Sequence, residues 1–258
     1  MDTLIHPSAI VDSGAILGEN VKIGPYAVIE NNVILGEGTE IGASAFVGYG
    51  ARLGKDVKIF PHAVIATAPQ DLKFGGEFTT CEIGDRTVVR EFATVNRGTK
   101  AHMRTVVGSD CFLMSYSHIA HDCTVGNNCI LANSATLAGH VTIEDWVIIG
   151  GLVPIHQFVK IGCHAMIGGG WRVPMDVPPF VTAAGNPLKP LDLNKIGLTR
   201  RGFTPETISN LKKAFRILFR SKQDMKRALE ELDSLGDLGP DVGHLKEFIR
   251  TSERGVIM

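Results

Sequence analysis

The chain has 258 residues, 44% of them hydrophobic and 21% charged, and its 26 basic residues nearly balance 27 acidic ones. This composition is ordinary for a globular protein, and the balanced charge excludes a broad attraction to nucleic acid or to an anionic membrane surface. Because no run approaches the ~18 consecutive apolar residues of a membrane span and no signal peptide is recognisable, we expect no integral membrane segment.

An apolar residue recurs every six positions along most of the chain. In steps of six from Ile5 to Val173, every position holds Ile, Leu or Val except Asp71, Glu77 and Ala101. This period fits neither an α-helix nor an alternating strand, but it is typical of the short strands and tight turns of a parallel β-helix. Three hexads close one triangular coil, so residues 18 apart in the sequence should stack at ~4.8 Å. The aliphatic side chains should fill the interior, and any active site must then lie outside the prism.

Two further positions of the repeat carry small residues. The residue two places before each apolar position is usually small, and we expect it to point inward. The residue after the apolar position is often glycine, which we interpret as tolerance of the backbone angles of tight turns. Cysteines on the small inward position predict buried packing roles and, without CxxC pairs, reduced thiols in a cytoplasmic protein. These cysteines are Cys81, Cys111, Cys123 and Cys129, whereas Cys163 lies off this column.

The hexads lapse twice, over residues 66–82 and 96–106, where polar and glycine residues replace the pattern. Loops ejected from a regular scaffold are candidate functional elements. The repeat ends after Val173, and a proline-rich segment leads into a region with helical periodicity. We therefore predict an all-β domain, a parallel β-helix, over residues 1–190 and a small α-helical domain over residues 191–258.

Three helices are predicted in the C-terminal domain. The first begins with Thr204 as N-cap and Pro205 at the first helical position. Its apolar residues recur at helical spacing and predict one buried face. These residues are Ile208, Leu211, Phe215 and Leu218. The other two helices are expected at residues 223–235 and 241–251.

The densest group of polar residues is the run HIAHDCTVGN. His118 lies on a predicted strand, His121 and Asp122 fall in the turn that follows, and His140 lies 18 residues after Asp122. These residues should therefore cluster on one edge of the prism. A carboxylate beside imidazoles raises their basicity and fixes a tautomer, which suits a general base. Solvated surface histidines, or a zinc site made of three histidines, are the alternatives that the residues leave open.

Several motifs follow one another over nearly the whole chain. They are QDLKFGGE, TVNRGT, HIAHDCTVGNNCILANSATLAGHV, IIGG, HQF, DVPPFV, GNP and RRGF. In this order they resemble the UDP-N-acetylglucosamine acyltransferase family of hexapeptide-repeat acyltransferases. The resemblance implies a left-handed β-helix, homotrimers with sites in clefts between neighbouring prisms, and neither metal nor other cofactor. Members of the family transfer an (R)-3-hydroxyacyl chain from acyl carrier protein to the sugar 3-hydroxyl of UDP-N-acetylglucosamine, which is the first step of lipid A biosynthesis.

The matching motifs imply roles for individual residues. His121 would be the general base, Asp122 would orient it, and the Gly139 backbone N–H would donate to the oxyanion. The sugar oxygen would attack the thioester directly, which agrees with the lack of a G-x-S-x-G nucleophile motif. Gly169 aligns with the acyl-chain ruler of the family, where a glycine leaves the groove open for a long chain, although a plain turn glycine is an equal alternative. The implied substrate contacts are His118 and His140 with the sugar or its phosphates, Asp71 and Lys73 with the sugar and donor, His156 and Gln157 with the nucleotide and pantetheine, and Asn194 and Arg200 near the nucleotide.

Two residues depart from the family pattern. Asn96 stands where the best-known members have His, and Ile196 stands where they have Glu. The loss of an acceptor at Ile196 puts part of the nucleotide contact in doubt. Some members of the family acylate a 3-amino sugar nucleotide and make an amide instead of an ester. Asn96 therefore makes the 3-amino analogue of the sugar nucleotide an alternative acceptor.

Other functions agree less well with the residues. The related glucosamine N-acyltransferase carries an extra N-terminal domain before its repeats, whereas the hexads here begin at Ile5. A zinc-dependent enzyme, such as the hexad-repeat carbonic anhydrases, would need stoichiometric zinc. A non-catalytic or ice-binding β-helix would present regular ladders, often of Thr, in place of two loops and a histidine cluster. The basic run KKAFRILFR is most often a solvated helix face, but it could offer cations to an acidic acyl carrier protein.

Overall fold

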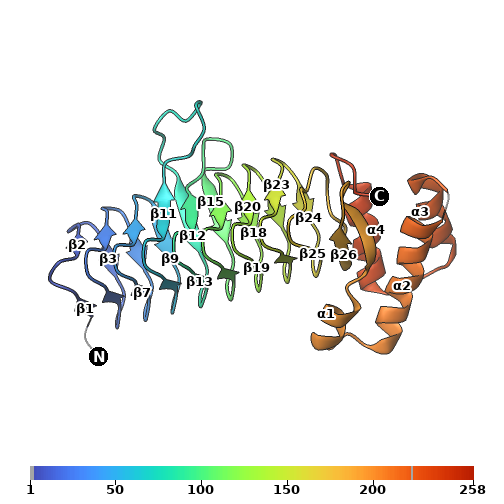
Figure 1. The fold of residues 1–258 in the computed structure, drawn as a ribbon, viewed down its shortest axis with the longest axis horizontal. Coiled ribbons are helices and arrows are strands. Elements are labelled where there is room, and N and C mark those ends of the chain that lie inside the picture. Colours follow the sequence, from blue (N-terminus) through green and yellow to red (C-terminus); the bar gives the residue numbers. More distant parts are fainter. Residues whose placement is uncertain (1–2, 222) are drawn as a thin grey trace.

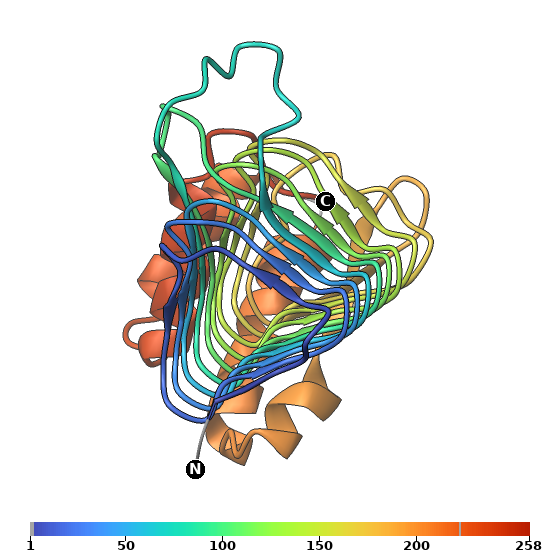
Figure 2. The same ribbon diagram turned by 90° about the vertical axis from the view of Figure 1, so that its left-hand side faces the viewer.

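The chain winds into a parallel β-helix that ends in a group of α-helices, as Figure 1 shows for the computed structural model, which describes residues 3–221 and 223–258. Each coil contributes one short strand to each of three sheets, so neighbouring strands differ by three in number as far as β25, after which β26 and the antiparallel β27 complete the first sheet. Viewed along its axis, the β-helix is a triangular prism, and two long loops project from it on the same side (Figure 2).

The strands of the three sheets follow in spatial order. The first sheet contains β1 (Leu4–Ile5), β4 (Lys22–Ile23), β7 (Glu40–Ile41), β10 (Lys58–Ile59), β13 (Val88–Val89), β16 (Phe112–Leu113), β19 (Ile130–Leu131), β22 (Ile148–Ile149), β25 (Met166–Ile167), β26 (Val181–Ala184) and β27 (Lys189–Leu193). The second sheet contains β2 (Ile10–Val11), β5 (Val28–Ile29), β8 (Phe46–Val47), β11 (Val64–Thr67), β14 (Thr94–Asn96), β17 (His118–Ile119), β20 (Thr136–Leu137) and β23 (Pro154–Ile155). The third sheet contains β3 (Ile16–Leu17), β6 (Ile34–Leu35), β9 (Ala51–Leu53), β12 (Thr80–Ile83), β15 (Arg104–Val107), β18 (Thr124–Val125), β21 (Thr142–Ile143) and β24 (Lys160–Ile161).

The register of the sheets follows the hexads. Ile23 of β4 pairs with Ile41 of β7, so residues 18 apart stack as the repeat predicts. The stacked aliphatic side chains fill the prism: Ile29 and Leu35 are each 1% exposed. The cysteines on the inward positions, from Cys81 to Cys129, are likewise buried, which confirms their predicted packing role. Cys163 is half-buried.

The glycines of the repeat have a different role from the one inferred above. Gly36 and Gly150 do not have a positive φ, but a Cβ atom at Gly36 would lie 2.3 Å from the carbonyl oxygen of Gly54 in the next coil. The left-handed backbone conformation occurs two residues after the repeat position of these glycines, at residues such as Asn20, Gly38 and His140, the last with a φ of 62°. The interpretation based on backbone angles is therefore wrong for these glycines. They are required because adjacent coils approach too closely for a side chain.

Both interruptions of the hexads leave the prism where the second sheet turns toward the third. Residues 68–79 form a loop between β11 and β12, and residues 97–103 form a shorter loop between β14 and β15. The strands on either side reach into the ranges 66–82 and 96–106 given above, because β11, β12 and β15 are four residues long. The domain boundary predicted between residues 190 and 191 falls within β27, and the two-domain division stays a prediction.

The helices are α1 (Lys195–Arg200), α2 (Pro205–Arg220), α3 (Met225–Ser234) and α4 (Pro240–Arg250). In α2 the Thr204 hydroxyl caps the N-terminus and the predicted apolar face is buried. The short helix α1 was not expected, although Asn194 at its N-cap is a recognisable start signal. The helices meet the prism through pairs such as His244 and Glu144, whose Nε2 and Oε2 atoms lie 2.8 Å apart. Among the helices described here, none is long and apolar enough to cross a membrane.

Candidate active site

The three edges of the prism are made of the turns between successive sheets, and two of these edges differ in their side chains. The edge between the second and third sheets, called the histidine edge below, contains the loops 68–79 and 97–103 and the turns 121–122, 139–140 and 157–158. The edge between the third and first sheets, called the ladder edge, contains the turns 85–86, 109–110, 127–128, 145–146 and 163–164.

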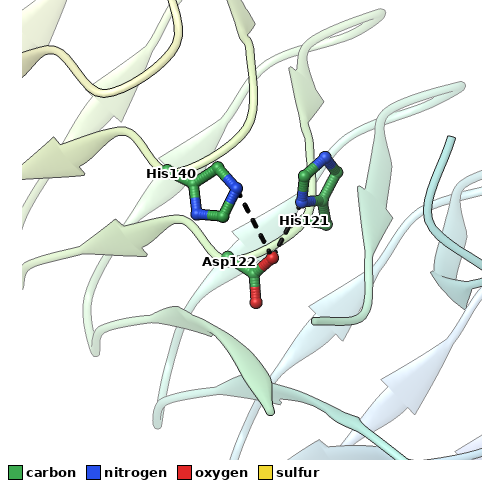
Figure 3. Close-up of side chains that lie close together, drawn as sticks. All are labelled: His121, Asp122 and His140. Atoms are coloured by element: carbon green, nitrogen blue, oxygen red, sulfur yellow. Dashed lines mark hydrogen bonds and ion pairs between the residues drawn. The ribbon is translucent and has the colours of Figure 1, made fainter. Parts of the chain in front are cut away.

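His121, Asp122 and His140 lie together on the histidine edge (Figure 3). The Nδ1 atom of His121 is 2.8 Å from Oδ2 of Asp122, and Nε2 of His140 is 3.9 Å from the same oxygen. The two imidazoles are 13% and 16% exposed, whereas the carboxylate is fully buried. The clustering predicted from the spacing of these residues is thus confirmed. Because the carboxylate accepts a hydrogen bond from Nδ1–H, the proton of the neutral ring stays on Nδ1. The unprotonated Nε2 of His121 is then free to take up a proton.

The carboxylate of Asp122 also accepts three hydrogen bonds from the loop 97–103. The Thr99 hydroxyl donates to Oδ2 over 2.6 Å, and the Thr99 and His102 backbone N–H groups donate to Oδ1 over 2.9 and 3.2 Å. Burial alone would raise the pKa of Asp122, but the hydrogen bonds from Thr99, His121 and His102 together lower it below its usual range. Neither Thr99, the last residue of the TVNRGT motif, nor His102 was singled out as a site residue in the sequence, and the signal that both share is the lapse of the hexads.

Gly139 lies directly beneath His121. A Cβ atom at this position would lie 2.7 Å from Cε1 and 2.8 Å from Nε2 of His121, so only glycine leaves room for the ring. Within residues 3–221 and 223–258, the Gly139 N–H donates to no carbonyl or side chain. The equivalent N–H on the ladder edge is occupied: that of Asn127 donates to Oδ1 of Asp145 over 2.7 Å. Gly139 thus presents a free donor beside a free base, as oxyanion stabilisation requires.

His118 and His140 flank His121. The Nδ1 atom of His118 lies 2.7 Å from the Thr94 hydroxyl. Burial, with a smaller contribution from His121, lowers the pKa of His118. Burial also lowers the pKa of His140, although Asp122 opposes this shift. Both imidazoles are therefore neutral near neutral pH and suited to hydrogen bonding rather than to charge pairing.

Four more of the residues singled out in the sequence lie along the histidine edge. Asp71 and Lys73 are in the loop 68–79, where the Lys73 N–H donates to Asp71 Oδ1 over 3.0 Å. The Asp71 carboxylate lies near enough to His140 to favour the protonated form of its ring. His156 Nδ1 lies 2.9 Å from the Arg254 guanidinium and 3.1 Å from the Gln157 carbonyl oxygen. Gln157 is exposed in the adjoining turn.

The remaining residues singled out in the sequence lie elsewhere on the chain. Gly169 is exposed on the third edge, in the turn that stacks on Gly151 through the Gly170 N–H. Asn194 is buried, and its side chain accepts from the Gly197 N–H and donates to the His164 carbonyl. Arg200 and Ile196 are exposed on α1. One chain alone does not bring these residues to the histidine edge.

Asn96, which departs from the family pattern, lies at the base of the loop 68–79. Its side chain is 2% exposed, and the amide nitrogen donates to the Thr67 hydroxyl over 2.9 Å and to the Ala68 carbonyl over 3.3 Å. Its amide oxygen has no hydrogen-bond partner among the described residues. Asn96 thus fixes where the loop leaves β11, and it retains one unused acceptor.

The histidine cluster has the spacing of a metal site, since the ligand atoms of His121, Asp122 and His140 all lie within 4.8 Å of one another. The hydrogen bonds argue against this function. Each oxygen of the Asp122 carboxylate already accepts two hydrogen bonds, so a cation would have to displace donors from Thr99, His102 or His121. The donor set fits a hydrogen-bonded base better than a metal ligand.

The prism of hexads, together with the family models that match it, places the chain in the class of hexapeptide-repeat transferases. Residues 14–49 and 104–139 match the family model described as bacterial transferase hexapeptide (six repeats). Residues 176–257 match the model described as Udp N-acetylglucosamine O-acyltransferase; Domain 2.

Relatives covering almost the whole chain make the assignment specific. The chain is 46% identical over 99% of both lengths to the acyl-[acyl-carrier-protein]--UDP-N-acetylglucosamine O-acyltransferase of Herminiimonas arsenicoxydans, and 47% identical, with the same coverage, to that of a Janthinobacterium strain. The solved structure of the UDP-N-acetylglucosamine acyltransferase of Bacteroides fragilis superimposes with a TM-score of 0.97 at 44% identity, covering 99% of this chain and 100% of that one. The chain belongs to the acyl-[acyl-carrier-protein]--UDP-N-acetylglucosamine O-acyltransferase family. The predicted fold class, a left-handed parallel β-helix with a small C-terminal helical region, is confirmed.

Proposed function

We propose that this chain transfers an (R)-3-hydroxyacyl group from acyl carrier protein to the 3-hydroxyl of UDP-N-acetylglucosamine, the first step of lipid A biosynthesis. The observation that carries the proposal is the pair His121–Asp122 beside the free Gly139 N–H, in a chain of this family. A buried carboxylate, a base with one open nitrogen and an unoccupied backbone donor are the three groups that a direct acyl transfer requires.

The transfer begins at Nε2 of His121. Since Asp122 accepts a hydrogen bond from Nδ1–H, Nε2 carries the lone pair that removes the proton from the sugar 3-hydroxyl as its oxygen attacks the thioester carbon. The resulting imidazolium is stabilised by the Asp122 carboxylate, which stays ionised because its hydrogen bonds lower its pKa. Asp122 is therefore the orienting residue and not itself a proton carrier.

The second half of the reaction uses Gly139. Its N–H donates to the oxyanion that forms on the former thioester carbonyl, in a region where the His121 ring excludes any side chain. Collapse of this intermediate breaks the carbon–sulfur bond, and the departing thiolate of the carrier takes the proton from His121 Nε2. No acyl-enzyme is formed, and the four inward cysteine thiols are buried inside the prism.

The other residues singled out in the sequence would contact the substrates. His118 and His140, both neutral, would hydrogen-bond the sugar rather than pair with its phosphates. Asp71 and Lys73 would position the sugar and donor from the loop 68–79. His156 and Gln157 would contact the nucleotide and pantetheine. Gly169 would leave the acyl groove open for a long chain.

We propose a homotrimer, and the places of the remaining residues support it. Asn194, Arg200 and Gly169 are on other edges or on α1, so they reach the histidine edge only if a neighbouring chain supplies them. We therefore place the complete site in the cleft between two prisms. Lys212, Lys213 and Arg216 are exposed on α2 and offer cations to the acidic carrier protein. The five free cysteines agree with a reaction in the cytoplasm.

The test is acyl transfer by the purified chain from (R)-3-hydroxyacyl carrier protein, with UDP-N-acetylglucosamine and its 3-amino analogue compared at equal concentration. We expect transfer to the hydroxyl sugar, loss of transfer in His121→Ala, and wild-type transfer in the matched variant His62→Ala, whose ring is exposed on the third edge. Preference for the amino sugar would make Asn96, with its unused acceptor, the residue that selects the acceptor. Transfer to neither sugar would overturn the proposal, and transfer that depends on added zinc would restore the metal alternative.

A further inference from the structure

The loop 97–103 supplies three of the four hydrogen bonds to the Asp122 carboxylate. Thr99 alone supplies two of the four hydrogen bonds to the carboxylate, one from its hydroxyl and one from its backbone N–H. Both residues are buried, since Thr99 is 6% exposed and Asp122 2%. The Asp122 backbone N–H is held as well, by the Thr105 hydroxyl over 2.8 Å.

A fully buried carboxylate is costly unless donors satisfy it. The Thr99 hydroxyl and His121 Nδ1 share the same oxygen, Oδ2, whereas Oδ1 is held by backbone donors. The two donors to Oδ2 fix the rotation of the carboxylate about its last bond, and that rotation determines whether Oδ2 points at His121. Without the Thr99 hydroxyl, the carboxylate keeps its charge but loses a hydrogen bond that fixes its rotation and keeps Oδ2 directed at His121.

We infer that Thr99 is a positioning residue of the reaction, which acts through Asp122 by aiming Oδ2 at His121 Nδ1. The inference rests on the proposed function. It also gives the second interruption of the hexads a function: the loop 97–103 holds Thr99 against the Asp122 carboxylate. Through Thr99 the loop then contributes to the chemistry.

The alternative explanation is that Asp122 merely anchors the loop and Thr99 has no effect on the base. A double-mutant cycle distinguishes the two explanations. We expect Thr99→Val to lower kcat about tenfold while KM for the sugar nucleotide stays within about twofold, because the base and not the binding surface is disturbed. Thr99→Ser, which retains both donors, should stay within about threefold of wild type. In the Asp122→Asn background, Thr99→Val should have almost no further effect, because residues that act as a unit are not additive.

Thr87→Val is the matched control. Thr87 is equally buried, and its hydroxyl donates to the Gly108 carbonyl over 2.7 Å on the ladder edge, so its loss should leave kcat unchanged in both backgrounds. Circular dichroism and gel filtration establish that each variant folds and assembles, and Thr99→Ala replaces Thr99→Val if the latter does not. Equal losses from Thr99→Val in the two backgrounds, or a wild-type kcat, would overturn the inference.

A second measurement keeps this inference distinct from the proposed function. In protein labelled with carbon-13 at the aspartate carboxyl, the resonance that vanishes in Asp122→Asn reports the titration of Asp122. Thr99→Val should raise the pKa of Asp122 from its lowered value, whereas Thr87→Val should not. If the wild-type chain transfers no acyl group, the proposed function fails, and the titration still decides whether Thr99 holds this carboxylate. An unchanged pKa would refute the contact itself.

Discussion

The histidine edge and the ladder edge are built on the same backbone but use their polar side chains in opposite ways. On the ladder edge, the side chain of one coil caps the backbone of the coil before it: Oδ1 of Asn127 accepts from the Ser109 N–H over 2.9 Å, and Asp145 does the same for Asn127. On the histidine edge, the Gly139 N–H is left free and His121 is turned toward Asp122 instead. On the ladder edge the polar side chains hydrogen-bond the backbone of the neighbouring coil and stabilise the prism. On the histidine edge they are left available for chemistry.

Two histidines at the same position of their turns sharpen the contrast. His140 and His164 both have a positive φ, of 62° and 57°. His140 faces the Asp122 carboxylate, whereas His164 Nδ1 lies 3.2 Å from the guanidinium of Arg201. Arg201 also lies over the Trp146 ring. The ladder edge is thus where the helical region docks, and its histidine serves packing.

The largest expected effect comes from removing the charge that orients the base. Asp122→Asn should lower kcat by roughly 10²–10⁴-fold, because an amide oxygen that accepts from the Thr99 and His102 backbone N–H groups leaves the NH₂ group toward His121, which favours the wrong tautomer. Steady-state kinetics with saturating carrier and sugar nucleotide measure it. The comparable variant Asp145→Asn on the ladder edge should retain wild-type kcat. A drop of similar size in both variants would mean that the two edges do not differ in function.

A smaller loss is expected when Gly139 acquires a side chain. The methyl group of Gly139→Ala would lie 2.7–2.8 Å from the His121 ring and push it aside, which should lower kcat by roughly 10²-fold. The backbone of Gly139 does not need glycine, since its φ is not positive, so the variant should fold. Gly243→Ala in α4 is the control: nothing lies within 4 Å of its added methyl, and it should leave kcat unchanged while stabilising the helix by up to about 1 kcal/mol. Unaltered kcat in Gly139→Ala would show that the ring can move without loss.

The hexads predicted the prism because each regularly spaced aliphatic residue marks a position that points inward. This pattern is local and needs no information about distant parts of the chain. The cluster of His121, Asp122 and His140 could be predicted for the same reason, since a spacing of one coil fixes which residues stack. The contacts of Thr99 and His102 could not be predicted, because a loop outside the repeat has no register. Its sequence therefore does not indicate which residues of the prism its side chains contact. The role of the repeat glycines was also misjudged, since the approach of two coils depends on tertiary packing and not on the turn itself.

His164 on the ladder edge should make the free energy of unfolding depend on pH. Burial and the neighbouring Arg201 lower the pKa of His164 to about 4. An unfolded histidine has a pKa of about 6.5, so between these values the unfolded chain binds more protons, and stability is lost as the pH falls through this window. His164→Phe keeps a flat ring between Trp146 and Phe180 but cannot be protonated.

Urea unfolding at pH 7 and pH 5 measures this difference. The midpoint for wild type should fall more between the two pH values than the midpoint for His164→Phe. His62→Phe, which changes an exposed histidine stacked on Phe92, should follow wild type. Equal falls for wild type and His164→Phe would show that His164 does not disfavour protonation in the folded chain.

The smallest effect is expected from one rung of the ladder edge. Asn127→Ala removes the cap of the Ser109 N–H, but Asn127 is exposed, so water can replace the lost acceptor. The free energy of unfolding should therefore fall by less than about 1 kcal/mol, and kcat should not change. Urea midpoints and steady-state rates measured on the same preparation check both statements. A loss of activity in Asn127→Ala would mean that the ladder edge also faces a substrate, and the contrast between the two edges would then describe differences in hydrogen bonding but not in function.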